Sequence, residues 1–421
     1  GEGGAASGGP VSGLSRYNAN NVSGNLVENE EKARSDQENE VRKTRRERRF
    51  AQRSVLRTIT TLDRVKKCGI VTNGNEGEGR IALRVVGGTA YWSGYCTCGS
   101  IWACPVCQAK IRNYRAAEYA AMVAAHLLEA DADGNLTNTA WMVTLTARHR
   151  GKQPLEPLFD AVANGWRQLM GGTAWVGDKR YGTIGEREAL GVRGWIRSLE
   201  VTWGSRNWFH PHLHVVILLR NETCEDLAKA IHRWDKTWRR WMKKHGYEPS
   251  QQQGVKWVKV TTPEEAGSYI AKTQEGKGIG NELTRSDLKT GKGETIAMLE
   301  VLEYFRQTGD MAAIPIWQEY EKGTFGRRAM TTSRGLRKDL LPEEDEEEKQ
   351  DHEVAAMEAG GETILILPAE SRKAMHAVPL LETKLLDAYE EGGFPALVNL
   401  MTAYHLTYEL SHDVASAAKP S

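Results

Sequence analysis

Three histidines occur at alternate positions, His210, His212 and His214, and their imidazoles are side chains that can bind a metal ion or a phosphate. They lead into an unbroken apolar run of β-forming residues, so the sequence predicts a buried strand from Phe209 to Leu219. Side chains two apart on a strand point to the same face, which places His212 and His214 within reach of one ion. Several imidazoles on one face are difficult to satisfy without a cation or a phosphate, and we therefore predict a metal or phosphate site.

A second predicted strand, from Gly194 to Trp203, precedes the histidine strand. Only the short turn Gly204-Ser205-Arg206-Asn207 separates the two, so they are expected to pair as an antiparallel hairpin. This pairing brings Glu200 near the histidines. A carboxylate beside imidazoles favours Mg²⁺ or Mn²⁺ as the bound ion.

A third group of residues follows Pro263, which opens a predicted helix at its preferred first-turn position. Glu265 and Tyr269 are four residues apart, and Lys272 is three residues further on, so the three side chains share one helix face. A tyrosine nucleophile, a carboxylate that handles a proton and an ammonium that lowers the tyrosine pKa or holds a phosphate form a plausible site. Alone, this trio is typical of paired surface charges; beside the histidine strand it indicates catalysis.

Six cysteines are present, four of them crowded between Cys96 and Cys107. Cys104 and Cys107 have the spacing of a zinc knuckle, and Cys98 is expected to supply a third thiolate. Either Cys96 or Cys68 completes the tetrahedron, and the sequence does not choose between them. We interpret the cluster as a structural Zn²⁺ site in a cytoplasmic protein, with a redox pair or inert buried thiols as the alternatives.

The net charge of +1 does not by itself indicate a nucleic-acid-binding protein, but the charges are unevenly distributed. Eleven basic residues lie between Arg42 and Lys67 against only Glu47 and Asp63, which suits either a phosphate backbone or a solvated helix face. A second basic segment is expected to hold DNA near the active site. Its five candidate DNA-binding residues are Arg327, Arg328, Arg334, Arg337 and Lys338.

The remaining segments must position these residues. The order strand, helix, strand, strand, helix, strand, helix that starts at Trp141 predicts an α+β domain with an antiparallel sheet. No apolar stretch approaches the roughly 20 residues of a membrane span, so no membrane partner is expected. The predicted organisation is a disordered leader (1–40), a basic segment with a cysteine-rich zinc-binding module and a long helix (41–135), a catalytic domain (136–280), a helical basic DNA-contact region (281–340), and an acidic linker with a small C-terminal appendage (341–421).

With these motifs in this order, the sequence resembles the rolling-circle replication initiators (Rep) of bacterial plasmids, specifically the single-tyrosine type of actinobacterial plasmids. The resemblance covers roughly residues 60 to 340. The family motifs correspond to Thr144–His149, His212–His214 and Tyr269–Lys272. The resemblance implies an HUH endonuclease domain, with a central antiparallel sheet and flanking helices of the ferredoxin or RRM-like type, preceded by a small zinc-binding module.

The resemblance also implies a metal-dependent single-strand DNA endonuclease and strand transferase. Tyr269 is expected to attack the scissile phosphate at the plasmid origin, which gives a 5′-phosphotyrosine link and a free 3′-OH primer for DNA replication, and later to religate. Mg²⁺ or Mn²⁺ on His212, His214 and Glu200 is expected to polarise the phosphate oxygens, while Glu265 activates water at termination. Expected partners are single-stranded or cruciform origin DNA, a host DNA polymerase and, since no Walker A sequence is present, a host helicase.

Three other functions fit part of the pattern. The spacing of His210, His212 and His214 also matches histidine-triad nucleotide hydrolases, which would cleave an adenosine phosphoramidate without metal. A non-catalytic zinc-bearing DNA-binding regulator would bind DNA without forming a tyrosine-linked adduct. A relaxase or a transposase of the HUH class would share the chemistry and differ in its DNA substrate.

Overall fold

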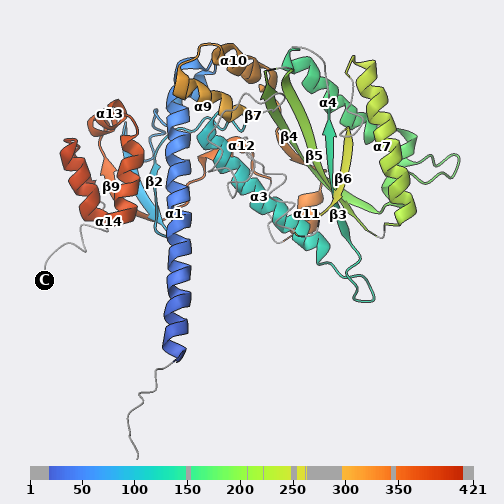
Figure 1. Cartoon of the computed structure of the whole chain (residues 1–421), viewed down its shortest axis with the longest axis horizontal. Helices are drawn as coiled ribbons and strands as arrows, with labels where there is room; N and C mark the ends of the chain where they lie inside the picture. Colours follow the sequence, from blue (N-terminus) through green and yellow to red (C-terminus); the bar gives the residue numbers. More distant parts are fainter. Residues whose placement is uncertain are drawn as a thin grey trace, which may run out of the picture. The chain divides into compact units, whose positions relative to one another are not determined.

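The computed structural model describes residues 19–147, 153–205, 207–220, 222–247, 254–260, 262, 296–342 and 348–410, with side chains from residue 37 on. The chain divides into two compact units, residues 1–48 and 49–421. The second unit contains two antiparallel sheets with helices around them (Figure 1), which confirms the predicted α+β class. Among the described residues, no helix combines the length and apolar composition that a membrane crossing requires.

The larger sheet has the histidine strand in its interior. Its order is β6-β3-β5-β4-β7, and β8 pairs with β4 beside that path, all in antiparallel register. The predicted hairpin around the histidines is therefore confirmed as β4 and β5. The strands are β3 (Thr139–Thr146), β4 (Val192–Gly204), β5 (Trp208–Leu219), β6 (Val255–Lys259), β7 (Ile296–Ala297) and β8 (Met330–Thr332).

Helices of the second unit surround the two sheets. Helix α1 (Ala19–Ile59) crosses the boundary between the two units. The others are α2 (Asp63–Lys67), α3 (Pro105–Leu127), α4 (Leu155–Leu169), α5 (Gly172–Val176), α6 (Glu186–Ala189), α7 (Cys224–Lys244), α9 (Met298–Thr308), α10 (Ala313–Thr324), α11 (Leu336–Leu340), α12 (Asp351–Ala356), α13 (Ala369–Ala377) and α14 (Leu381–Ala403).

One face of the larger sheet is buried under α4 and α7 (Figure 1). The ring of Trp166 on α4 lies 5.4 Å from that of Trp195 on β4, and the ring of Trp234 on α7 lies 4.9 Å from that of Trp257 on β6. On β5, this face carries odd-numbered residues such as Leu213, which is fully buried. Because side chains alternate along a strand, the even-numbered histidines project from the opposite face.

The smaller sheet joins the cysteine-rich module to the C-terminal residues. Its order is β10-β9-β1-β2, with β1 (Ile81–Val86) and β2 (Thr89–Ser93) from the module, and β9 (Glu362–Leu367) and β10 (Glu409–Leu410) from the end of the chain. The segment interpreted as a small appendage thus supplies two strands of this sheet. No sequence pattern predicted this pairing, because about 280 residues separate the paired strands β1 and β9.

Helix α1 differs from the predicted disordered leader of residues 1–40, since it begins at Ala19. Its sequence from residue 28 onward is rich in Glu, Lys, Arg and Gln, which favour a helix even without an apolar stripe. The domain boundaries proposed from the sequence stay predictions.

A buried ion pair between Arg53 of α1 and Glu382 of α14 tests how these two helices are held together. Arg53 and Glu382 of α14 lie 3.1 Å apart, and their side chains are only 6% and 10% exposed. Glu382→Gln should lower the free energy of unfolding by about 3–5 kcal/mol, because it leaves a buried guanidinium without its counter-charge. Asp63→Asn, which removes an exposed partner of Lys66 at 3.8 Å, should cost less than about 1 kcal/mol. Urea unfolding measures both, and equal losses would contradict the argument.

Candidate functional site

The β4–β5 pairing brings together the three residues predicted to bind the divalent ion. Glu200 lies opposite His212 in the register of the hairpin, and its Oε2 accepts a hydrogen bond from Nε2 of His214 at 3.0 Å. The rings of His212 and His214 stack with centroids 6.3 Å apart. The side chains of His214 and Glu200 are 13% and 19% exposed, so this site is partly open to solvent.

Two threonines of β3 contact the other side of the imidazoles. Thr144 lies opposite His214 and Thr146 opposite His212 in the β3–β5 register. Their hydroxyl oxygens are 3.2 Å and 3.3 Å from the Nδ1 atoms of the facing histidines. A contact at Nδ1 orients an imidazole and leaves Nε2 for another partner. These contacts of the threonines were not predicted from the sequence, although the two-residue alternation of both strands is a signal that could have found them.

Burial and nearby charges determine whether the side chains of His212 and Glu200 carry a proton. Burial lowers the pKa of His212 to about 4, against the opposing attraction of Glu200, so the imidazole is neutral near pH 7. Burial raises the pKa of Glu200, but the hydrogen bond from His214 and nearby positive charge outweigh it and leave the pKa below its usual value. A neutral imidazole beside an ionised carboxylate is the form that binds a cation. Unlike the cysteine thiols described next, the ligand atoms of the trio do not all lie within 4.8 Å of one another.

The cysteine cluster is closed and buried. The Sγ atoms of Cys68, Cys98, Cys104 and Cys107 all lie within 4.8 Å of one another, and each residue is at most 5% exposed. Cys68 Sγ is 3.7 Å from Cys104 Sγ and 3.6 Å from Cys107 Sγ, and Cys98 Sγ is 3.7 Å from Cys107 Sγ. A Zn²⁺ ion bound at about 2.3 Å by four thiolates needs sulfur atoms about 3.8 Å apart. The four cysteines could therefore hold a metal such as zinc, and the half-buried Cys96 is not in the group.

The surroundings of the cluster also favour a cation held by thiolates. Hydrogen bonds from Cys104, Cys107 and Cys98 hold the pKa of the Cys68 thiol well below its usual value, and the buried Arg53 acts in the same direction. Contacts with neighbouring thiols and burial raise the pKa of the other three thiols, so without a metal the cluster shares its protons unequally. A metal ion removes the protons from all of its thiol ligands. Arg53 would then neutralise part of the negative charge of a four-thiolate site.

The five candidate DNA-binding residues have different environments. Arg327 donates a hydrogen bond to Asp160 at 2.7 Å, and Arg337 donates one to Glu118 at 2.7 Å, so both are already paired within the protein. Arg328, Arg334 and Lys338 are exposed. The predicted nucleophile helix with Glu265, Tyr269 and Lys272 lies outside the described residues, as does His149.

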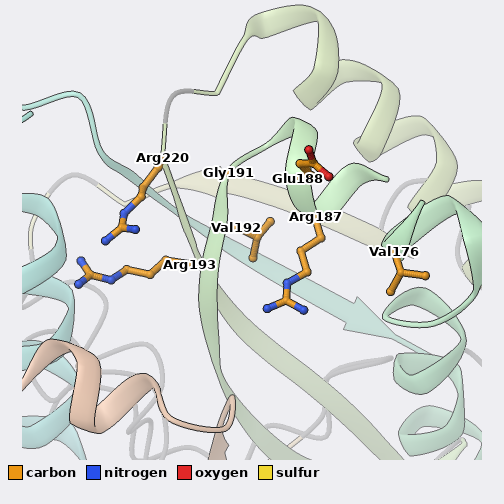
Figure 2. Close-up of a pocket in the computed structure, with 7 residues that line it drawn as sticks. All are labelled: Val176, Arg187, Glu188, Gly191, Val192, Arg193 and Arg220. Carbon is orange, nitrogen blue, oxygen red and sulfur yellow. The ribbon is translucent and has the colours of Figure 1, made fainter. Parts of the chain in front are cut away.

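A cavity of about 490 Å³ lies at the far end of the β4–β5 hairpin (Figure 2). Figure 2 shows the guanidinium groups of Arg193 and Arg220 side by side and that of Arg187 apart from them. Glu129 pairs with both Arg193 and Arg220. Arg220 follows His214 by six positions, or about 20 Å of extended chain, so the cavity is not part of the histidine site.

Comparison of the sequence with known proteins identifies a family and two relatives. Residues 92–366 match the family model described as Replication protein. A Streptomyces lividans protein named Protein rep is 32% identical over 354 residues, which cover 72% of this chain and 76% of that protein. A Streptomyces cyanogenus protein named Neomycin resistance protein is 31% identical over 190 residues, 38% of this chain and 42% of that protein. No solved structure gives a significant match.

The choice between Cys68 and Cys96 as fourth ligand can be tested directly. Cys68→Ser should lose stoichiometric zinc and lower the melting temperature, because a structural metal contributes folding free energy. Cys96→Ser should keep both, since Cys96 is not in the group of four. Zinc content by mass spectrometry and thermal unfolding measure these effects. Retention of zinc by Cys68→Ser and loss by Cys96→Ser would reverse the assignment.

Proposed function

The chain belongs to the replication protein family, of the type found in actinobacteria, and from this premise we propose that it initiates rolling-circle replication of a plasmid. It would do so by nicking one strand at the origin. The observation that carries the proposal is the 3.0 Å hydrogen bond between His214 and Glu200, which lies inside the matched residues. This bond supports a paired imidazole and carboxylate on one partly open face of the sheet, as an HUH endonuclease domain requires.

The proposed chemistry is a phosphoryl transfer to a tyrosine. The oxygen of Tyr269 forms a bond to the scissile phosphorus while the bond from phosphorus to the 3′-oxygen breaks, and a proton passes to the departing oxygen. The products are a 5′-phosphotyrosine and a free 3′-OH that primes synthesis. Lys272, one turn away, would stabilise the phenolate or hold the phosphate. Because the phosphotyrosine bond keeps the energy of the phosphodiester, religation needs no ATP.

The residues of the sheet would hold and orient the reacting phosphate through a cation. The donor set His212, His214 and Glu200 suits Mg²⁺ or Mn²⁺, which would neutralise charge on the non-bridging oxygens. Thr144 and Thr146 contact Nδ1 of the two imidazoles, so Nε2 is the atom of each ring that would bind the ion. For His214, the ion would replace the Nε2 proton that is now shared with Glu200. The buried cysteines would hold a structural Zn²⁺ away from the reaction.

The partners follow from the same proposal. The substrate is single-stranded or cruciform origin DNA, held near the site by exposed Arg328, Arg334 and Lys338. A host helicase and a host DNA polymerase would supply unwinding and synthesis in the cytoplasm. Glu265, one helical turn before Tyr269, would activate the water that hydrolyses the regenerated origin at termination.

Two variants separate the roles of Tyr269 and Glu265. The assay uses labelled single strands tiled across the DNA that flanks the coding sequence, with Mg²⁺ or Mn²⁺, and scores a denaturation-resistant protein–DNA adduct. Tyr269→Phe should bind the DNA and form no adduct. Glu265→Ala should form the adduct at a near-normal rate but yield multimeric displaced strands in a replication assay. An adduct from Tyr269→Phe, or monomer-length product from Glu265→Ala, would place that role elsewhere.

A third variant tests the role of the histidines. His214→Ala should reduce adduct formation at least about 100-fold, because it removes a predicted ligand of the catalytic ion. Its melting temperature should change little, since His214 lies on the partly open face of the sheet. His232→Ala, at an exposed position of α7, is the matched control and should remain active. Full activity of His214→Ala would argue against metal-assisted nicking at this face.

A further inference from the structure

Helix α7 ends in an exposed row of positive charge. Its last ten residues contain five basic side chains and one acidic side chain, Asp235, which pairs with Arg239 at 2.6 Å. The other four basic residues are exposed, and none has a carboxylate partner among the residues that the structure describes. We call them the α7 basic stripe: Lys236, Arg240, Lys243 and Lys244.

The α7 basic stripe projects from a helix whose opposite face is packed into the core. Trp234, Trp238 and Met242, on the other side of α7, are fully buried. Trp238 Nε1 donates a hydrogen bond to the carbonyl of Thr146 at 3.0 Å, which fixes α7 to the strand beside the histidines. A partner that binds the stripe would therefore not have to order the helix itself.

Positive charge continues from α7 onto strand β6, which lies beside the helix (Figure 1). Lys256 and Lys259 of β6 are exposed. Lys256 lies opposite Thr144 in the β3–β6 register, so it projects from the same face as His214, whereas Lys259 projects from the face that α7 covers. The β6 edge of the sheet thus carries one exposed lysine on the face that α7 covers and one on the face of the histidines.

Ordinary structural causes do not account for the whole stripe. The helix dipole favours Lys243 and Lys244 in the last turn, but that effect does not extend to Lys236 and Arg240. Lysines on an edge strand also discourage pairing with other strands, which explains β6 but not α7. From Lys236 to Lys243 the helix rises about 10 Å, a span of about three phosphates at 3.4 Å per nucleotide.

The chemistry of the surface selects duplex over single-stranded nucleic acid. Single strands bind where exposed aromatic rings stack on the bases. Here Trp234 and Trp238 are fully buried, and the indole N–H of Trp241 donates to the carbonyl of Ala161 on α4. The ring of the half-buried Trp241 already contacts the His245 ring at 4.3 Å and the Lys244 ammonium at 5.9 Å. The stripe therefore offers positive charge without a fully exposed indole, which suits the phosphate backbone of a duplex.

We propose that the α7 basic stripe, extended by Lys256 and Lys259, binds the phosphate backbone of duplex DNA next to the nicking site. The duplex lies along α7, and its strand crosses the β6 edge onto the face that carries His212 and His214. This inference rests on the proposed function for the identity of the nucleic acid. The surface itself is distinct from the residues assigned to cleavage.

The test compares two triple variants of the full chain. Lys236→Gln, Arg240→Gln and Lys243→Gln together remove the centre of the stripe, while Lys322→Gln, Lys373→Gln and Lys384→Gln remove three exposed lysines elsewhere. The probes are a fluorescent 25-base-pair duplex of mixed sequence and its labelled single strand. The stripe variant should bind the duplex roughly ten- to a hundredfold more weakly near 0.1 M salt, with a slope of log affinity against log salt reduced by about 2.7. The control variant should change neither quantity.

The outcomes separate this inference from the proposed function. Adduct formation on the tiled single strands should stay at the wild-type level in the stripe variant, since none of its three residues is assigned to cleavage. Unchanged duplex affinity, or an equal loss for duplex and single strand, would overturn the assignment of the stripe to duplex DNA. Absence of an adduct in the wild-type chain would instead reject the proposed function, while the duplex measurement still reports on the stripe.

Discussion

The register of the β4–β5 hairpin is the constraint on which the candidate site depends. One pairing puts Leu213 and its neighbours into the core beneath α4 and α7 and, in the same step, puts Glu200 beside His212 and His214. A slip by one residue would exchange the two faces, burying imidazoles and exposing leucine. The free energy of apolar burial therefore holds the two strands in the register that brings the polar group together, and the contacts of Thr144 and Thr146 then orient the imidazoles.

The two candidate metal sites differ as structural and catalytic sites usually do. The four clustered cysteines are closed off by the core, and their sulfur atoms already have the spacing of a tetrahedron. The histidine and glutamate site is partly exposed and its ligand atoms are spread more widely, which leaves room for a substrate phosphate. The cysteine cluster also contributes to the fold, since Arg53 connects its surroundings to Glu382 of α14.

Local patterns were sufficient to predict much of this arrangement. Alternation of side chains and a short turn predicted β4, β5 and the approach of Glu200, and cysteine spacing predicted three members of the group of four. The choice of Cys68 over Cys96 depends on how the segment after α2 folds back toward α3, which no spacing rule contains. The pairing of Arg327 with Asp160 and of Arg337 with Glu118 could not be predicted either, because the partners are distant in sequence.

The pairing of β1 with β9 has a consequence for synthesis of the chain. Ile81 of β1 pairs with Leu367 of β9, so at roughly 5–20 residues per second the ribosome needs about 15–60 s to supply the partner. During that interval β1 and β2 form at most an isolated hairpin, which is marginally stable in water and has both outer edges unpaired. The nascent module is therefore exposed to wrong strand pairing until β9 has been synthesised, and early binding of a metal by the cysteines would reduce the number of conformations that it can adopt.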